Sequence, residues 1–282
     1  MSEGTEGSAI LRSVTGRGRE GGAIAIVGEA ALFTAVGLAL MIGAGLPEAG
    51  AFSVFLAAAA LAGRLGRVLD ENRDAIWRRG ERPAVANRRA VVALAALFVG
   101  IGLAFVIVAA VIGPDALPRT FGQTLAGDAG VGALQSRRFS AGVGPLLLHN
   151  LGTLAVLMLI GFIYRTYGVL LTLGWNAALW AVVLTGLVAR GLAQTSVSGP
   201  LFVLGALAAI GPHLLIELLG YVLGTLAAVF ASRGLLRHPR GDKRRRQVAW
   251  AVTQLFAVGV ALLMLAALVE HYWAPWMLAR LR

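Results

Sequence analysis

Residues 200–231 read PLFVLGALAAIGPHLLIELLGYVLGTLAAVFA, and this stretch decides the class of fold. Its only residues of the types His, Asp, Glu, Lys and Arg are His213 and Glu217. A helix needs about 20 apolar residues to cross the hydrocarbon core of a bilayer, so the stretch exceeds one span. The Gly211-Pro212 step divides it, and proline suits the first position of a helix. We therefore expect a broken helix, with a short segment before this step and a full span over residues 212–232.

Six further apolar stretches lie along the chain, at residues 23–44, 51–69, 90–112, 144–163, 167–189 and 248–269. Overall, 58% of the residues are hydrophobic and 14% are charged, whereas about a quarter of a soluble domain is charged. The sequence therefore predicts an all-α, polytopic transmembrane helical bundle of about seven spans. The count falls to five or six if short stretches such as 51–69 lie at the interface instead of crossing.

The cations lie mainly in connectors between these apolar stretches, and the formal net charge is +11. The connectors at 64–89 and 233–246 are the most basic, so both are expected on the cytoplasmic side. Seven spans then place the N-terminus in the cytoplasm and the C-terminus outside. Because no basic soluble domain remains, the expected partner is the lipid bilayer and not nucleic acid.

The composition along the chain predicts four regions. They are a flexible N-terminal tail at 1–22, a helical hairpin with a basic cytoplasmic segment at 23–89, a five-helix core at 90–270, and a short C-terminal tail at 271–282. The tail is predicted to be flexible because it is polar and rich in Gly and Ser. The stretch from 113 to 143 lacks the apolar character of a span.

A polar centre is predicted inside the bundle. His213 and Glu217 are four residues apart and therefore share one helical face, which also carries Gly220 and Gly224. Ionisable groups are costly against lipid, so this face should meet other helices at the close-packing glycines. The candidate partners on other spans are His149, Asn150 and Asn176. The centre is either a functional site, such as a proton relay, or a structural contact that orients helices.

Metal and cofactor chemistry has weak support in the sequence. His149, His213 and Glu217 could together hold a metal, but the H-E-x-x-H motif of many zinc enzymes is absent. The chain has no Cys, which excludes disulfides and thiolate ligands. We therefore assign no metal, no cofactor and no catalytic residue.

The second basic connector contains a dense group of cations. They are Arg237, Arg240, Lys243, Arg244, Arg245 and Arg246. Such a group binds anionic lipid head groups in many membrane proteins, or it serves only to fix the topology.

The order of these motifs resembles the stage II sporulation protein M family of bacterial integral membrane proteins. The resemblance covers residues 90–269 and rests on two features besides His149-Asn150 and Asn176. Gly161 and Gly168 flank a tight turn, and Pro212-His213-x-x-x-Glu217 opens a Gly-rich helix. The resemblance implies a membrane scaffold that anchors envelope partners such as peptidoglycan-degrading proteins, without established catalytic residues.

Three functions follow as hypotheses. The first is a non-enzymatic, multi-pass scaffold or assembly subunit of the bacterial inner membrane, acting with protein partners or as a homo-oligomer. The second is a transport subunit, either a small-solute transporter or an ABC-type permease, because broken helices often line transport sites. The third is an intramembrane metal-dependent hydrolase.

Overall fold

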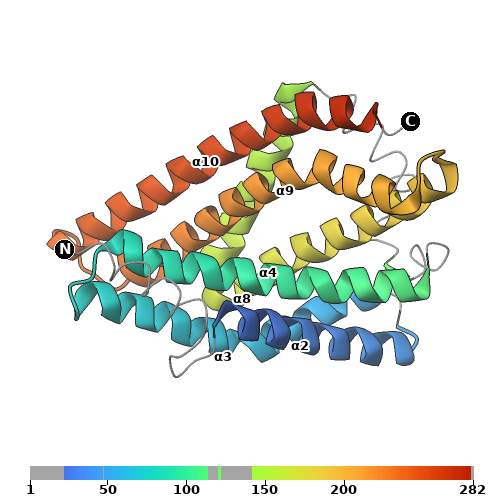
Figure 1. Ribbon diagram of the computed structural model, residues 1–282. Coiled ribbons are helices and arrows are strands. Elements are labelled where there is room, and N and C mark those ends of the chain that lie inside the picture. The colour runs from blue at the N-terminus through green and yellow to red at the C-terminus, as the bar shows by residue number, and fades with distance from the viewer. Residues whose placement is uncertain (1–21, 47, 114–119, 122–141, 281–282) are drawn as a thin grey trace, which may run out of the picture.

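A computed structural model describes residues 22–46, 48–113, 120–121 and 142–280, and this part of the chain is helical without strands (Figure 1). Its elements are α2 (Ala23–Gly43), α3 (Ala49–Trp77), α4 (Pro83–Ile112), α8 (Val143–Gln194), α9 (Gly199–Phe230), the π-helix η1 (Ala231–Leu235) and α10 (Lys243–Leu278). The six α-helices are each long and apolar enough to cross a membrane. The prediction of an all-α polytopic bundle is therefore confirmed. The predicted tail at 1–22 lies outside the described residues, apart from Gly22.

Helix α8 is a hairpin of two helical arms. At Arg165 the backbone adopts φ 55° and ψ −122°, which reverses the direction of the chain. Residues 160 and 168 would be about 12 Å apart in a straight helix. Instead, a Cβ atom on Gly168 would overlap the carbonyl oxygen of Ile160. The tight turn expected at 164–166 is therefore present, and the two arms follow the predicted spans 144–163 and 167–189.

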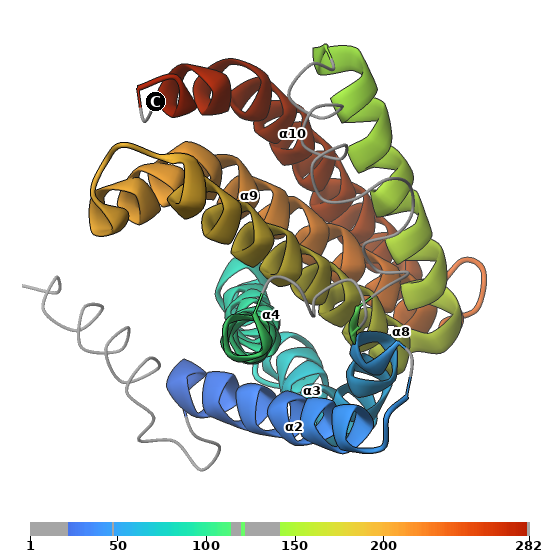
Figure 2. The ribbon, with the colours of Figure 1, turned by 90° about the vertical axis from the view of Figure 1, so that its right-hand side faces the viewer.

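The helices form two groups in space (Figure 2). One group contains α2, α3 and α4, in which α2 packs on both other helices and crosses α4 where Gly100 meets the Val27 backbone. The other group contains α8, α9 and α10, and α9 packs against both of its neighbours. The second arm of α8 joins the groups, because Gly174 lies against Val54 of α3 and Ile101 of α4.

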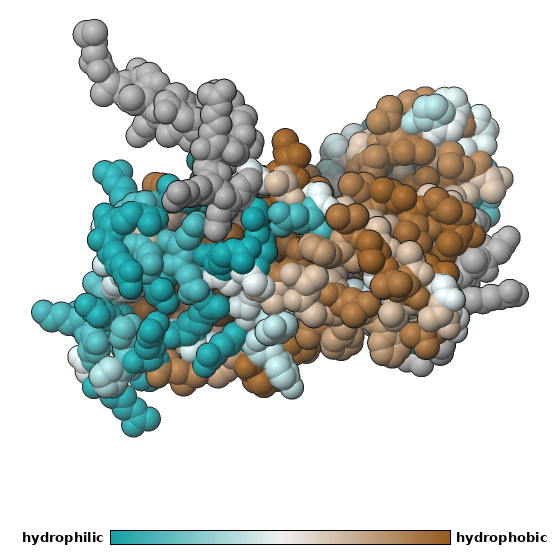
Figure 3. Space-filling model, turned by 90° about the horizontal axis from the view of Figure 1, so that it is seen from below, coloured by the Kyte–Doolittle hydropathy of each residue, from teal (hydrophilic) through white to brown (hydrophobic). Residues whose placement is uncertain are grey.

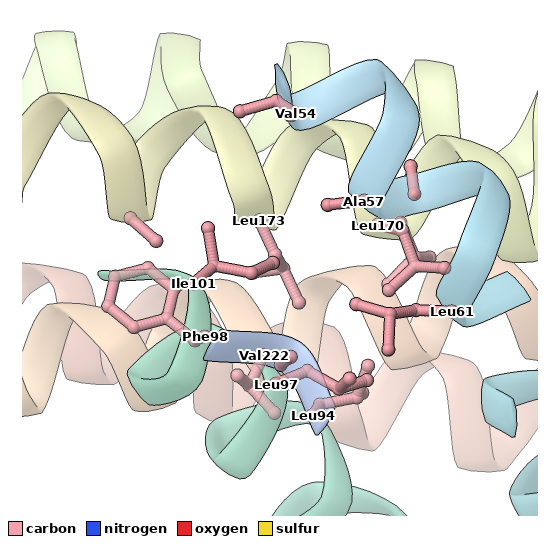
Figure 4. Packing of buried hydrophobic residues seen from close by; sticks show 14 of the residues in the cluster. Val54, Ala57, Leu61, Leu94, Leu97, Phe98, Ile101, Leu170, Leu173 and Val222 are labelled. Carbon is pink, nitrogen blue, oxygen red and sulfur yellow. The ribbon is translucent and has the colours of Figure 1, made fainter. Parts of the chain in front are cut away.

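An apolar core fills the contact between the two groups (Figure 4). Leu61 from α3, Leu97 from α4, Leu173 from α8 and Val222 from α9 are each 2% exposed or less. Every one of these side chains belongs to the same buried hydrophobic cluster. The N-terminal helices and the C-terminal helices therefore share one core.

The predicted break near Gly211-Pro212 is wrong, because α9 continues through it from Gly199 to Phe230. A proline inside a helix leaves the carbonyl four residues earlier without its usual donor, and that carbonyl belongs to Ala208. The indole Nε1 of Trp273 on α10 donates a hydrogen bond to this oxygen at 2.9 Å. The neighbouring helix thus replaces the missing backbone donor, which is how proline is tolerated in a membrane helix.

The polar connectors gather at one end of the molecule (Figure 3). Arg233 of η1 donates hydrogen bonds to Thr166 at the α8 turn and to Asp70 of α3, at 2.8 and 3.2 Å. This places the connectors at 64–89, 164–166 and 233–246 on the same side, as the predicted topology requires. Helices α3, α4 and α10 also extend beyond the predicted apolar spans, to Trp77, Pro83 and Leu278.

Replacing Gly168 with Ala should destabilise the protein by about 2–4 kcal/mol, because the new methyl group would collide with the Ile160 backbone. The expected result is a fall of roughly 5–15 °C in the Tm of the detergent-purified protein. Gly152→Ala is the matched control on the same helix, since a Cβ there meets nothing within 4 Å. Equal Tm values for the two variants would contradict the close approach of the arms.

Trp273→Phe should cost about 1–2 kcal/mol, because the Ala208 carbonyl would lose its donor within the bundle. In a Pro212→Ala background the alanine N–H restores the helical donor, so the same change should cost less. A double-mutant cycle in Tm or denaturant stability measures the difference, which should be about 1 kcal/mol. Additive effects of the two substitutions would show that the indole does not compensate for the proline.

Candidate functional site

One face of α9 carries a continuous polar stripe. His213 and Glu217 are each 3% exposed, Tyr221 is 1% exposed and Thr225 is fully buried. The four residues follow at intervals of four, so the helical period alone aligns them. The Tyr221 hydroxyl donates a hydrogen bond to Glu217 Oε1 at 2.8 Å. The predicted pair is thus part of a longer buried stripe.

Helix α10 covers this stripe in an antiparallel register. Gly220 of α9 faces Gly259 and Leu263 of α10, with a Cβ on Gly220 only 2.9 Å from Leu263 Cδ2. The contact between Trp273 and Ala208 fixes the same register toward the other end. By that register Glu270, which is 5% exposed, lies at the level of His213. Two acidic groups and an imidazole are therefore buried along the α9–α10 contact.

The first arm of α8 closes another side of the stripe. A Cβ on Gly224 would overlap Leu154 of this arm, and Gly161 meets Ala228 one turn further along α9. Asn150 lies one turn before Leu154 and is 3% exposed. Gly224 therefore packs against the first arm of α8, and its backbone N also lies 3.6 Å from the Cβ position of Gly259 on α10.

The two other predicted residues, His149 and Asn176, differ in their exposure. His149 lies on the exposed side of the first α8 arm. Asn176 is buried, but its Nδ2 donates to the Thr172 carbonyl of its own helix at 2.9 Å. Within the described ranges, no group of three or more His, Cys, Asp or Glu side chains could hold a metal ion. The His149, His213 and Glu217 metal site considered from the sequence is thus not assembled.

Sequence reasoning missed Tyr221 and Glu270. Tyr221 lies between Gly220 and Gly224, and this G-x-x-x-G spacing predicts only close helix packing. Glu270 comes just after the predicted end of the span at 248–269. Its signal is periodic, because Gly259, Leu263 and Glu270 recur on the buried face of α10.

A separate apolar cavity of about 210 Å³ lies on a different face of α9. Its wall comes from α4, the second arm of α8 and α9, including Phe98, Trp180 and Leu214. Neither His213 nor Glu217 contributes to the wall. The polar stripe is therefore enclosed by packed helices and does not line this cavity.

The polar end of the molecule holds a network of ion pairs around the α3–α4 connection. Glu81 pairs with Arg79 and Arg89 at 3.0 and 3.1 Å. The hydrogen bond from Arg79 and the positive charge of Arg89 lower the pKa of Glu81 below its ordinary value of 4.5, although partial burial opposes this. Glu81 therefore stays charged at neutral pH and ties the start of α4 to the end of α3.

These features define a multi-pass helical membrane protein with a buried polar stripe on its penultimate helix. The chain matches the family model described as SpoIIM, Stage II sporulation protein M, over residues 122–275, and it belongs to that family. The match takes in α8, α9 and most of α10, so it is narrower than the resemblance over 90–269. Comparison with curated proteins and with solved structures gives no match.

Tyr221→Phe should destabilise the protein by about 1–2 kcal/mol, because Glu217 would lose a buried donor. The Tm of the detergent-purified variant measures the loss. Tyr272→Phe is the control, because Tyr272 is 66% exposed and its change should leave the Tm within about 1 °C. An unchanged Tm for Tyr221→Phe would mean that this hydroxyl does not support the stripe.

Proposed function

We propose that this protein is a non-enzymatic scaffold of the bacterial inner membrane that assembles with other envelope or membrane proteins. The observation that carries the proposal is the enclosure of the polar stripe within a helix contact. A site for transport or hydrolysis needs access for solute or water. Here His213 and Glu217 are each 3% exposed and lie outside the described cavity.

The stripe is suited to holding helices in a fixed arrangement. Interhelical hydrogen bonds in membranes contribute roughly 0.5–2 kcal/mol each, and glycines let the backbones approach closely. Gly220 and Gly259 bring α9 and α10 together beside the buried acids. A stable relative placement of helices is the property that a scaffold requires.

The outer face of α10 supports contact with a partner. Gln254 is exposed and lies about 12 Å along the helix from Arg246, inside the apolar part of the span. An amide is costly against acyl chains, and a hydrogen-bonding helix from another protein or a second copy would satisfy it. The outer face of α10 therefore offers a polar contact at Gln254 to a partner helix.

The sequence features that suggested transport or hydrolysis are absent from the described part of the structure. The transport hypothesis rested on a broken helix, and α9 runs continuously through Pro212. The hydrolase hypothesis rested on a metal site, and the described residues assemble none. No observation in this structure specifically favours either activity.

The proposal is tested by affinity purification of the full chain from its native membrane in mild detergent. A membrane or envelope protein should be recovered in stoichiometric amount. Gln254→Leu should lower its recovery about threefold or more, since one interhelical hydrogen bond would be lost. Gln247→Leu, an exposed amide nearer the basic end, is the control and should leave recovery unchanged.

Two outcomes would overturn the scaffold function. Repeated recovery of the chain alone, from membranes that retain their full protein content, would remove the assembly role. Stoichiometric recovery of an ATPase would instead support the permease function.

A further inference from the structure

The two basic connectors differ in how their charges are neutralised. In the α3–α4 connection most arginines have acidic partners, as in the pairs of Arg73 and Arg78 with Asp74 and of Arg79 with Glu81. In the α9–α10 connection five exposed cations have no ion pair or side-chain hydrogen bond within the described part of the chain. They are Arg237, Arg240, Lys243, Arg244 and Arg246. This connection therefore presents an uncompensated positive surface.

The α9–α10 connection is also held in a defined shape. The sixth cation, Arg245, donates from Nη1 to the carbonyl oxygens of Leu235 and His238, at 3.0 and 3.1 Å. Asp242 caps α10 by accepting a hydrogen bond from the Arg244 backbone N–H at 2.8 Å. Its carboxylate also lies 3.6 Å from His238. The acidic residue and one arginine thus shape the turn, and the other five cations remain available to an external anion.

The position of the turn favours a lipid head group over a soluble anion as its ligand. Trp250 follows Arg246 by one helical turn and is 64% exposed, as expected for an indole at the membrane interface. The free cations therefore lie at the level of the lipid head groups.

We propose that the α9–α10 turn binds the phosphate head groups of anionic phospholipids in the cytoplasmic leaflet. The chemistry is that of several exposed guanidinium groups and one ammonium group around acidic phosphate, close to a helix N-terminus that also favours anions. Each such cation strengthens attraction to an anionic membrane surface by roughly fivefold. The proposal is independent of the scaffold function.

The test measures lipid binding by the full-length, detergent-purified protein. Phosphatidylglycerol and phosphatidylcholine are titrated separately, and the dissociation constants are read by thermophoresis or native mass spectrometry. The wild-type protein should bind phosphatidylglycerol at least tenfold more tightly. The turn variant replaces four cations with Gln, at Arg237, Arg240, Arg244 and Arg246. The control variant removes the same charge from the α3–α4 connection, at Arg78, Arg79, Arg82 and Arg88.

The turn variant should lose tenfold or more in affinity for phosphatidylglycerol, and the control variant should lose less than threefold. Equal losses would overturn the site, because net charge alone would then explain binding. Equal affinity of the wild type for both lipids would also overturn it. Inorganic phosphate forms a third titration, and binding as tight as that of the lipid would reassign the turn to soluble phosphate.

The single variant Arg240→Gln tests the proposal even if the fourfold variant does not fold. Its Tm should match that of the wild type, because the Arg240 side chain is exposed and forms no ion pair or side-chain hydrogen bond with the residues that the structure describes. It should still weaken phosphatidylglycerol binding about three- to fivefold. Unchanged binding in this correctly folded variant would count against the proposal.

Discussion

The structure depends on enclosing the polar face of α9, because a bilayer offers no water to hydrogen-bond its buried groups. Four polar side chains at intervals of four, from His213 to Thr225, would face acyl chains on an isolated helix. Packing of α10 and the first arm of α8 against this face removes it from lipid. The backbone follows the same constraint, because the Ala208 carbonyl freed by Pro212 takes its hydrogen from Trp273.

Glycine makes this enclosure possible at each crossing. Gly220 and Gly259 let the α9 and α10 backbones approach, so that the Gly259 Cβ position lies 3.0 Å from the Gly220 carbonyl oxygen. The α8 hairpin uses Gly168 in the same way, while Arg165 takes the positive φ that usually favours glycine. Arg165 stands at the polar end of the molecule, where its side chain is exposed. The helix contacts therefore follow from where side chains are absent as much as from where they are present.

Much of the fold was accessible from sequence because hydropathy blocks, glycine-flanked turns and arginine asymmetry are local signals. These signals predicted the spans, the turn at Arg165 and the shared side of the basic connectors. The predicted break at Pro212 is wrong. The local sequence marks proline as a helix breaker, whereas the compensating donor, Trp273, follows Pro212 by 61 residues. For the site, burial of His213 and Glu217 agrees with their spacing on one face. His149 lies on the exposed side of the first α8 arm, and spacing within one helix does not determine which neighbouring helices cover a given face.

The family match also divides the structure in a way that bears on how it works. Helices α2, α3 and α4 precede the matched residues 122–275, yet Leu61 and Leu97 belong to the same core as Leu173 and Val222. At the polar end of the molecule Arg233 joins the two parts, since it bonds to Thr166 of the matched region and to Asp70 of α3. A guanidinium with two such acceptors restrains η1, the α8 turn and the extension of α3 together. Movement of the extended α3–α4 connection would therefore act directly on the polar ends of the family helices, through a charged contact instead of through the apolar core.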